Sequence, residues 1–99
     1  MHARSGAFVI STEKVDEAVE KFESEQLSRY KEQDGYKGFT LLADRENGRV
    51  LGISFWESED ALHGSDELGQ EARDQIKEVG EAEADPERMD WEVVVDDTA

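Results

Sequence analysis

The stretch Gly38–Ser58, GFTLLADRENGRVLGISFWES, decides the fold of this chain. Two apolar runs, Phe39–Ala43 and Val50–Trp56, flank a polar segment that contains the dipeptide Asn47-Gly48. Because Asn and Gly tolerate the positive φ angles of a tight or bulged turn, this dipeptide between apolar runs is a strong hairpin signal. Ser58, followed by two acidic residues, is typical of a helix start. The stretch therefore predicts strand, turn, strand and helix.

The side-chain pattern of the two hairpin strands predicts a sheet with unlike faces. Alternate residues of a strand share a face, which groups the odd-numbered residues of Phe39–Ala43 and those of Leu51–Phe55. We expect these two groups to form one strongly apolar face. The opposite face is then mixed, with small residues beside Leu42, Val50 and Trp56.

The segment before the hairpin predicts a strand and a helix. Ala3–Ile10 suits a strand, and Glu13 to about Lys31 carries an apolar stripe at helical spacing with one polar interruption. Gly35 can adopt the left-handed conformation that ends a helix. The stripe consists of Val15, Ala18, Val19, Phe22, Gln26 and Tyr30.

The segment after the hairpin predicts a second helical region and a last strand. The helix begins at Ser58–His63, is interrupted at Gly64-Ser65, and resumes with a second apolar stripe. Gly80–Asp85 reads as an acidic loop, Met89–Val95 as a closing strand, and Asp96–Ala99 as a polar tail. The second stripe consists of Leu68, Ala72, Ile76 and Val79.

The order β-α-β-β-α-β predicts a single α+β domain over residues 1–99 with a ferredoxin-like fold. In that fold a four-stranded antiparallel sheet carries both helices on one face. The other face holds too much apolar area for a solvated surface, so we expect a homodimer formed through the sheet faces. Trp91 is expected to contribute to that contact.

Composition excludes several classes of partner. The chain has 26 acidic and 11 basic residues and a net charge of −15. Such a charge repels phosphate backbones and anionic lipid, so neither nucleic acid nor a membrane surface is an expected partner. We interpret the acidic residues as a solvated surface that keeps the protein in solution. Such a surface could also reflect adaptation to high salt.

Cysteine is absent, which excludes disulfides, thiolate metal sites and thiol nucleophiles. No apolar run approaches the length needed to span a membrane, and Met1–Gly6 lacks the apolar core of a signal peptide. We therefore expect a cytoplasmic protein. His2 and His63 are too far apart to show metal-ligand spacing, so no metal or other cofactor is expected.

Several segments resemble the antibiotic biosynthesis monooxygenase-like proteins of the dimeric α/β-barrel superfamily. These are the approach to the first hairpin strand, Gly35–Phe39; the turn, Asn47–Val50; the strand end and helix start, Ser54–Glu59; and the last strand, Trp91–Val95. The resemblance implies a dimeric α/β barrel and three candidate activities. They are cofactor-free oxidation of an aromatic compound, haem degradation, and ligand binding without chemistry.

Haem degradation is disfavoured by the residues themselves. Haem-degrading members of this family use an Asn, a Trp and a His. The corresponding positions here hold Ser5 or Gly6, then Ser65, then Gln75. Trp56 is the structural Trp of the family and does not replace the Trp of the haem site.

Two functional hypotheses remain open. The first is a cofactor-independent monooxygenase that oxidises a small aromatic compound through an activated carbanion, with His63 as the candidate catalytic base. The second is a non-catalytic dimer that binds a small molecule or has a structural role. A pocket between helices and sheet would be lined by Trp56, Tyr30, Phe39, Phe22 and Phe55, which would equally suit a plain core.

Overall fold

The computed structural model describes residues 1–98, and Ala99, the end of the predicted tail, lies outside the described residues. Four strands and two interrupted helical regions follow the predicted order. The first half contains β1 (His2–Val9), η1 (Thr12–Lys14), α1 (Val15–Glu25), α2 (Leu27–Lys31) and β2 (Tyr36–Asp44). The second half contains β3 (Arg49–Trp56), α3 (Glu59–Gly64), α4 (Asp66–Val79) and β4 (Glu87–Glu92).

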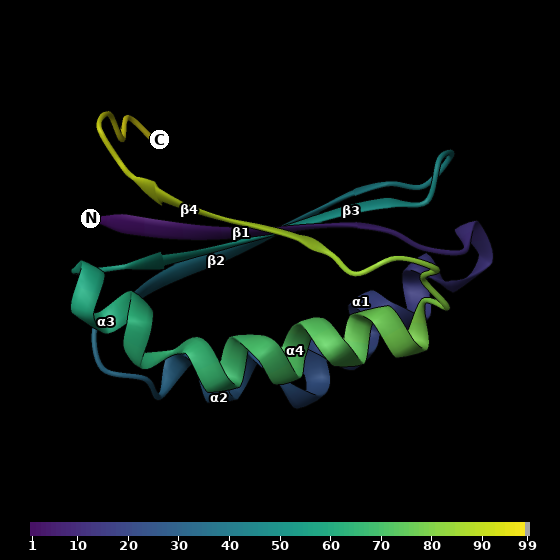
Figure 1. Cartoon of the computed structure of the whole chain (residues 1–99), viewed down its shortest axis with the longest axis horizontal. Helices are drawn as coiled ribbons and strands as arrows, with labels where there is room; N and C mark the ends of the chain where they lie inside the picture. Colours follow the sequence, from purple (N-terminus) through teal and green to yellow (C-terminus); the bar gives the residue numbers. More distant parts are fainter. Residues whose placement is uncertain (99) are drawn as a thin grey trace.

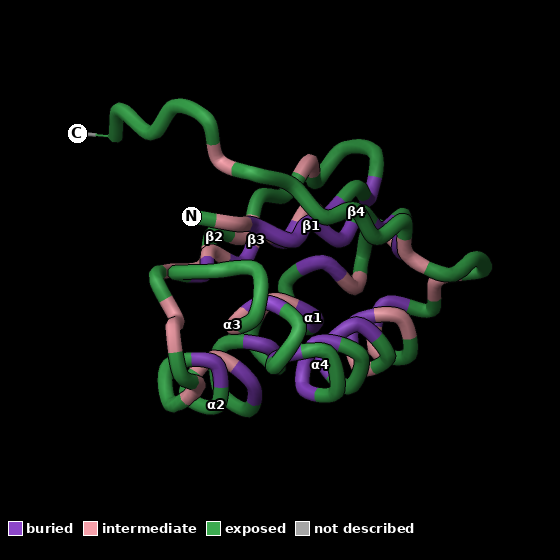
Figure 2. Tube along the Cα trace, turned by 60° about the vertical axis from the view of Figure 1, so that its left-hand side comes forward, coloured by how far each residue is buried: buried purple, intermediate pink, exposed green. Residues whose placement is uncertain are grey.

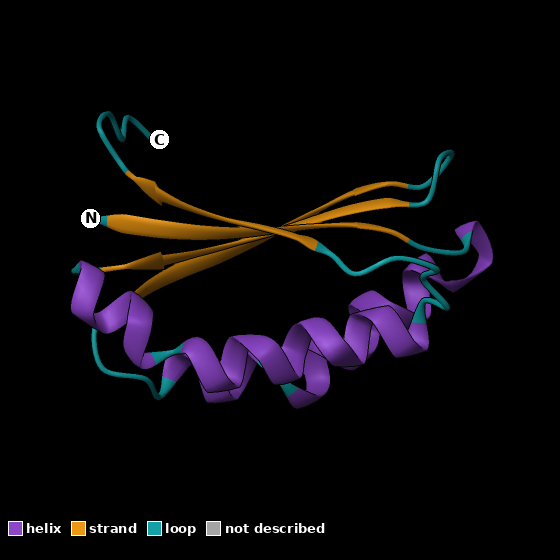
Figure 3. Cartoon of the chain, in the orientation of Figure 1, coloured by secondary structure: helices purple, strands orange, loops and turns teal. Residues whose placement is uncertain are grey.

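The strands form one sheet in the order β2-β3-β1-β4, and every neighbouring pair is antiparallel. The helices cover one face of this sheet, and the other face is left open (Figure 1 and Figure 3). The predicted ferredoxin-like α+β fold is therefore confirmed.

The two hairpin strands pair differently from the predicted grouping of faces. Asp44 pairs with Arg49 across the four-residue turn, so odd-numbered positions of β2 face even-numbered positions of β3. Phe39 consequently points to the helices together with Ser54, whereas Leu42 and Leu51 share the open face. The prediction that Phe39–Ala43 and Leu51–Phe55 put their odd-numbered residues on one face was wrong, because it took no account of the register that the turn imposes.

Two element boundaries also differ from the prediction. The first helix is interrupted at Gln26, the polar member of its stripe, where φ is −110°. The last strand ends at Glu92 and not at Val95, because its partner β1 begins at His2, which pairs with Glu92. The backbone N–H of Val93 then donates to the carbonyl of Met1 at 2.9 Å, beyond which β4 has no neighbour.

The core lies between the sheet and the helices, where buried positions follow the inner sides of β1, α1 and α4 (Figure 2). Both predicted helical stripes point inward. Ser58 caps α3 by accepting a hydrogen bond from the Ala61 N–H at 3.1 Å. Within residues 1–98, none of the helices has both the length and the apolar character that a membrane span requires.

Candidate functional site

The sheet has a hollow under the helices, at a pair of glycines. Gly6 of β1 faces Gly52 of β3, and both are buried on the helix-covered side. A Cβ atom at Gly52 would lie 3.2 Å from Cζ of Phe39, and one at Gly6 would lie 3.4 Å from Cδ of Arg73. The ring of Phe39 and the stem of Arg73 therefore occupy the space that two side chains would otherwise fill. Glycine inside a strand often marks such a close approach.

A cavity of about 30 Å³ lies above this hollow. A space of that size holds roughly two water molecules, so it is closed to an organic ligand in this conformation. Its lining combines aromatic rings with an unusual number of polar side chains. The lining residues are Arg4, Gly6, Phe8, Phe22, Tyr30, Phe39, Gly52, Ser54, Ala72, Arg73 and Ile76.

Aromatic rings form one wall of the cavity. The centroid of Phe22 lies 4.6 Å from that of Phe39 and 5.8 Å from that of Tyr30. Tyr30 also packs against Phe39 at 5.1 Å and against Trp56 at 6.2 Å. Four of the five aromatic residues expected at a pocket are thus brought together. The fifth, Phe55, lies on the open face of the sheet, because its neighbour Ser54 points inward.

Arg4 links the cavity to two acidic residues. Its side chain is only 4% exposed, and its guanidinium donates to Asp90 of β4 at 2.7 and 3.2 Å and to Asp66 of α4 at 2.6 Å. Burial opposes the charge of Arg4, but these hydrogen bonds outweigh burial, and the pKa of Arg4 is raised. The hydrogen bonds from Arg4 lower the pKa values of Asp66 and Asp90. This buried cation is fully paired.

Arg73 of α4 is a buried cation without such pairing. It is 8% exposed, and among residues 1–98 its guanidinium forms no ion pair with a carboxylate. Its one side-chain hydrogen bond, to Oε1 of Gln70, is long at 3.5 Å. Burial is the main cause that lowers the pKa of Arg73; the charges of Arg4 and Arg88 lower it too, whereas Tyr30 and Asp74 act in the opposite direction. Among residues 1–98 the one fully enclosed side-chain N or O atom without a hydrogen-bond partner is Oε1 of Gln75, so the unpaired N–H donors of Arg73 reach water.

A third arginine adds to this positive charge. Arg88 of β4 pairs in register with Gly6 and stands close enough to Arg73 to lower its pKa. Arg4, Arg73 and Arg88 converge here, but Arg4 is paired with Asp66 and Asp90, and Arg88 lies 4.0 Å from Asp90, so most of this positive charge is offset. Within residues 1–98, Arg73 is the member of this group without a carboxylate partner.

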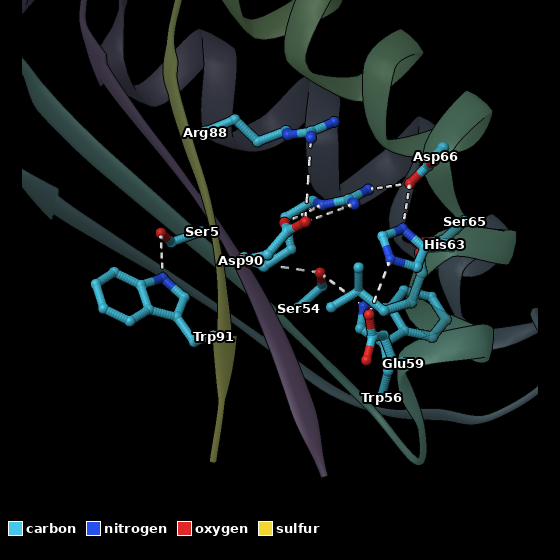
Figure 4. A network of polar contacts seen from close by, with 12 residues as sticks. Ser5, Ser54, Trp56, Glu59, His63, Ser65, Asp66, Arg88, Asp90 and Trp91 are labelled. Atoms are coloured by element: carbon cyan, nitrogen blue, oxygen red, sulfur yellow. Dashed lines mark hydrogen bonds and ion pairs between the residues drawn. The ribbon is translucent and has the colours of Figure 1, made fainter.

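His63, the base expected from the sequence, lies outside the cavity lining. Its side chain is 51% exposed, with Nε2 at 3.6 Å from Glu59 and Nδ1 at 3.9 Å from Asp66 (Figure 4). Its one link to the cavity runs through Asp66, which also accepts a hydrogen bond from Arg4. His63 is thus placed to influence Arg4 and not to contact a ligand in the present conformation.

The positions compared with the haem-degrading proteins have other roles in this structure. Ser5 accepts a hydrogen bond from Nε1 of Trp91 at 2.9 Å on the open face (Figure 4). Ser65 donates to the carbonyl of Leu62, and Gln75 donates to Glu25. Of these positions only Gly6 lines the cavity. Among residues 1–98 no group of His, Cys, Asp and Glu side chains is arranged to hold a metal ion.

Sequence reasoning missed both arginines, although weak signals existed. Alternation in β1 places Arg4 on the same face as Gly6 and Phe8, so an inward-pointing charge was foreseeable. Arg73 directly follows Ala72 of the second stripe and therefore lies at its edge. Neither signal reveals that Arg4 is paired and Arg73 is not, because the partners come from β4 and from the first turn of α4.

Comparison with known proteins gives relatives of low sequence identity. No protein-family model matches the chain. The uncharacterized protein Rv2557 of Mycobacterium tuberculosis is 29% identical over 93 residues, which cover 94% of this chain and 41% of that protein. The chain therefore spans about two-fifths of the length of this curated relative.

Solved structures match the fold closely. The monooxygenase ActVA-Orf6 of Streptomyces coelicolor, solved with nanaomycin D, has a TM-score of 0.79 at 18% identity, covering 99% of this chain and 91% of that one. An antibiotic biosynthesis monooxygenase has a TM-score of 0.71 at 16% identity, covering 96% and 100%. MhuD, a heme-degrader of M. tuberculosis solved with two hemes, has a TM-score of 0.71 at 19% identity, covering 99% and 100%.

These identities are too low to transfer a function, but the architecture is shared along almost the whole chain. The chain has the ferredoxin-like fold of the antibiotic biosynthesis monooxygenase-like proteins, as the resemblance in its sequence predicts.

Proposed function

We propose that this chain is a monooxygenase-like protein that binds a small planar aromatic compound, as its anion, in the cavity between the helices and the sheet. The observation that carries the proposal is Arg73, which is 8% exposed: its stem lies at the cavity, and its guanidinium, beside Gly69 and Gln70, has no carboxylate partner among residues 1–98. Burying an unpaired charge is costly unless a ligand or another group compensates it. The rings of Phe22, Tyr30 and Phe39 offer a flat ligand an apolar wall.

The proposed reaction is oxidation by O₂ without a bound cofactor. An acidic methylene beside an aromatic ring loses its proton, and the guanidinium group of Arg73 stabilises the resulting anion. An opposite charge within about 4–6 Å lowers the pKa of an acid by about 1–3 units, so proton loss to water becomes easier. One oxygen atom of O₂ becomes the new carbonyl oxygen and the other leaves as water, so anthrone would give anthraquinone with no added reductant.

His63 enters this proposal as a positioning residue. It contacts Asp66, and Asp66 holds the guanidinium of Arg4 at the cavity. A direct role as the proton acceptor requires movement of α3, which carries His63 next to the exposed Gly64. The expected signature of positioning is a change in KM with little change in kcat when His63 is replaced by Ala.

Binding requires the cavity to open. Pockets for organic ligands are typically about 300–1,000 Å³, far above the present volume of about 30 Å³. The stem of Arg73 is flexible and fills the hollow over Gly6, so its displacement by a ligand would enlarge the space where the two glycines meet.

Oxygen uptake with anthrone, together with the appearance of anthraquinone, tests the proposed reaction. We expect turnover by the wild-type chain and a loss of at least tenfold in kcat/KM in Arg73→Met. Arg45→Met is the matched control, because Arg45 is exposed at the β2–β3 turn. Binding of aromatic anions without oxygen uptake would instead support the second hypothesis, a non-catalytic binding protein.

We also propose that two copies associate through their open sheet faces. Large apolar side chains gather there, and Leu42, Met89 and Trp91 are exposed while Leu51, Ile53 and Phe55 are half-buried. The four strands have 8, 9, 8 and 6 residues. With strands about 4.8 Å apart and a rise of about 3.3 Å per residue, they give a face of roughly 500 Å² in projection. The accessible area of a face covered with side chains exceeds its projection, which brings it near the ~800 Å² per partner of a stable interface.

A further inference from the structure

A second arginine, Arg88, stands beside Arg73 at the edge of the sheet. It belongs to β4, the outermost strand, and pairs in register with Gly6 of β1. Directly paired residues of neighbouring strands share a face, so Arg88 lies on the side of Gly6 over which the stem of Arg73 packs. Figure 4 shows its side chain leaving β4 on the side of the helices. The side chains of both arginines therefore meet above one glycine.

The carboxylates of this region do not balance its arginines. Asp90 accepts hydrogen bonds from Arg4 at 2.7 and 3.2 Å, and the nearest contact between Asp90 and Arg88 is 4.0 Å long. Asp66 is also held by Arg4, at 2.6 Å. Among residues 1–98 no carboxylate lies within ion-pair distance of Arg73. Three arginines thus share two carboxylates, which leaves one positive charge unbalanced at this edge.

Arg73 extends from the aromatic wall of the cavity to this charge. Its Cδ and Cγ atoms lie 3.4 and 3.7 Å from the position of a Cβ atom at Gly6, which lines the cavity. Its Nη1 atom lies 3.0 Å from the position of a Cβ atom at Gly69, one turn earlier in α4. A long side chain on a helix leans toward the N-terminus in this way. A ligand that lies along this stem has its ring at the aromatic wall and its other end at the guanidinium groups.

We propose that the ligand is an aromatic carboxylate, whose ring enters the cavity and whose carboxylate lies between the guanidinium groups of Arg73 and Arg88. This inference rests on the proposed function and specifies the class of compound that the site takes. A carboxylate is planar and carries one negative charge. It therefore matches both the planar fork of N–H donors on a guanidinium and the single unbalanced charge. Because Arg88 is half-exposed at the sheet edge, the carboxylate reaches it from solvent.

Paired titrations with 2-naphthoate and its neutral amide, 2-naphthamide, test the inference, because the two compounds share a ring and differ in charge. Binding is followed by the indole N–H signal of Trp56, which packs against Tyr30 at the cavity. Wild type should bind 2-naphthoate about tenfold more tightly than 2-naphthamide, because only the acid forms charged hydrogen bonds. Arg88→Met should lose about fivefold in affinity for 2-naphthoate, since water screens part of the charge of Arg88, and should bind 2-naphthamide like wild type.

Arg45→Met is the matched control, because it removes an equal charge from an exposed position at the β2–β3 turn. Equal losses of 2-naphthoate affinity in Arg45→Met and Arg88→Met, or equal binding of the acid and the amide by wild type, overturn the inference.

Arg73→Met separates failure of this inference from failure of the proposed function. If Arg73→Met weakens the binding of 2-naphthoate and Arg88→Met does not, the cavity still binds an aromatic anion and only the place of the carboxylate is refuted. A Trp56 signal that 2-naphthoate leaves fixed at millimolar concentration refutes both.

Discussion

Replacing Arg73 by Met tests most directly whether this arginine serves a ligand or stabilises the fold. The stem of Arg73 packs over Gly6, and Met can preserve that apolar contact. The guanidinium gains little in return for its burial, because its one side-chain hydrogen bond, to Gln70, is 3.5 Å long. If Arg73 serves a ligand and not the fold, its removal should stabilise the ligand-free chain.

The size of the effect follows from the cost of burying charge. Replacing buried ion pairs by apolar side chains is neutral or stabilising by about 1–4 kcal/mol, although the partner's attraction is then lost. Arg73 has no carboxylate partner among residues 1–98 to lose. We therefore expect Arg73→Met to raise the free energy of unfolding by about 1–2 kcal/mol, since removal of one positive charge from an acidic chain offsets part of the gain. For a domain of this size each kcal/mol shifts the Tm by about 4–8 °C.

Urea unfolding in moderate salt measures this change, because urea is uncharged and the salt screens long-range repulsion. The control Arg45→Met removes the same charge from an exposed site and should change stability by about 0–1 kcal/mol. A loss of more than about 1 kcal/mol in Arg73→Met, beyond that of the control, would show that Arg73 holds the fold together. The proposal that it is reserved for a ligand would then be refuted.

Three further predictions concern the fold and its charges. Arg4→Met should lower the free energy of unfolding by about 1–3 kcal/mol, because it removes charged hydrogen bonds to Asp66 and Asp90. Both carboxyl groups have lowered pKa values in the folded state, so their contribution to stability is present above about pH 4 and is lost as the pH falls through those values. The free energy of unfolding should therefore fall more steeply with decreasing pH in wild type than in Arg4→Met. Equal slopes in the two proteins would contradict this. Added salt should raise the Tm, because a net charge of −15 repels itself, and a salt-independent Tm would show that this repulsion is unimportant. Gly48→Ala should destabilise the chain by at least about 2 kcal/mol, because φ of Gly48 is +68° and a Cβ atom there would lie 2.1 Å from the Ile10 carbonyl oxygen. If urea unfolding shows that Gly48→Ala is as stable as wild type, this turn geometry is wrong.

The fold was largely predictable because its signals are local. Asn47-Gly48, the two helical stripes and the cap at Ser58 each act within one element, and the structure contains all of them. The pairing of β2 with β3 was not predictable from alternation alone. It depends on the number of residues in the turn, and a shift by one residue exchanges the two faces of a strand.

The candidate site was predictable only in part, for a related reason. Aromatic residues on the inward-facing sides of helices and strands can be recognised from their spacing in the sequence. The structure packs four of them together: Phe22, Tyr30, Phe39 and Trp56. Whether a charged residue is paired depends on contacts between residues far apart in the sequence. Arg4 finds Asp66 and Asp90 on two distant elements, so periodicity could not have distinguished it from Arg73.

The central claim, that the cavity binds an aromatic anion through Arg73, is tested most directly by an NMR titration with salicylate. The chain has two tryptophans, whose indole N–H groups report on different places: Trp56 packs against Tyr30 at the cavity, and Trp91 lies on the open face. We expect salicylate to shift the Trp56 indole signal saturably in wild type, to leave that of Trp91 in place, and to need at least a tenfold higher concentration in Arg73→Met. A Trp56 signal that stays fixed at millimolar salicylate, or that titrates identically in wild type and Arg73→Met, would contradict the account.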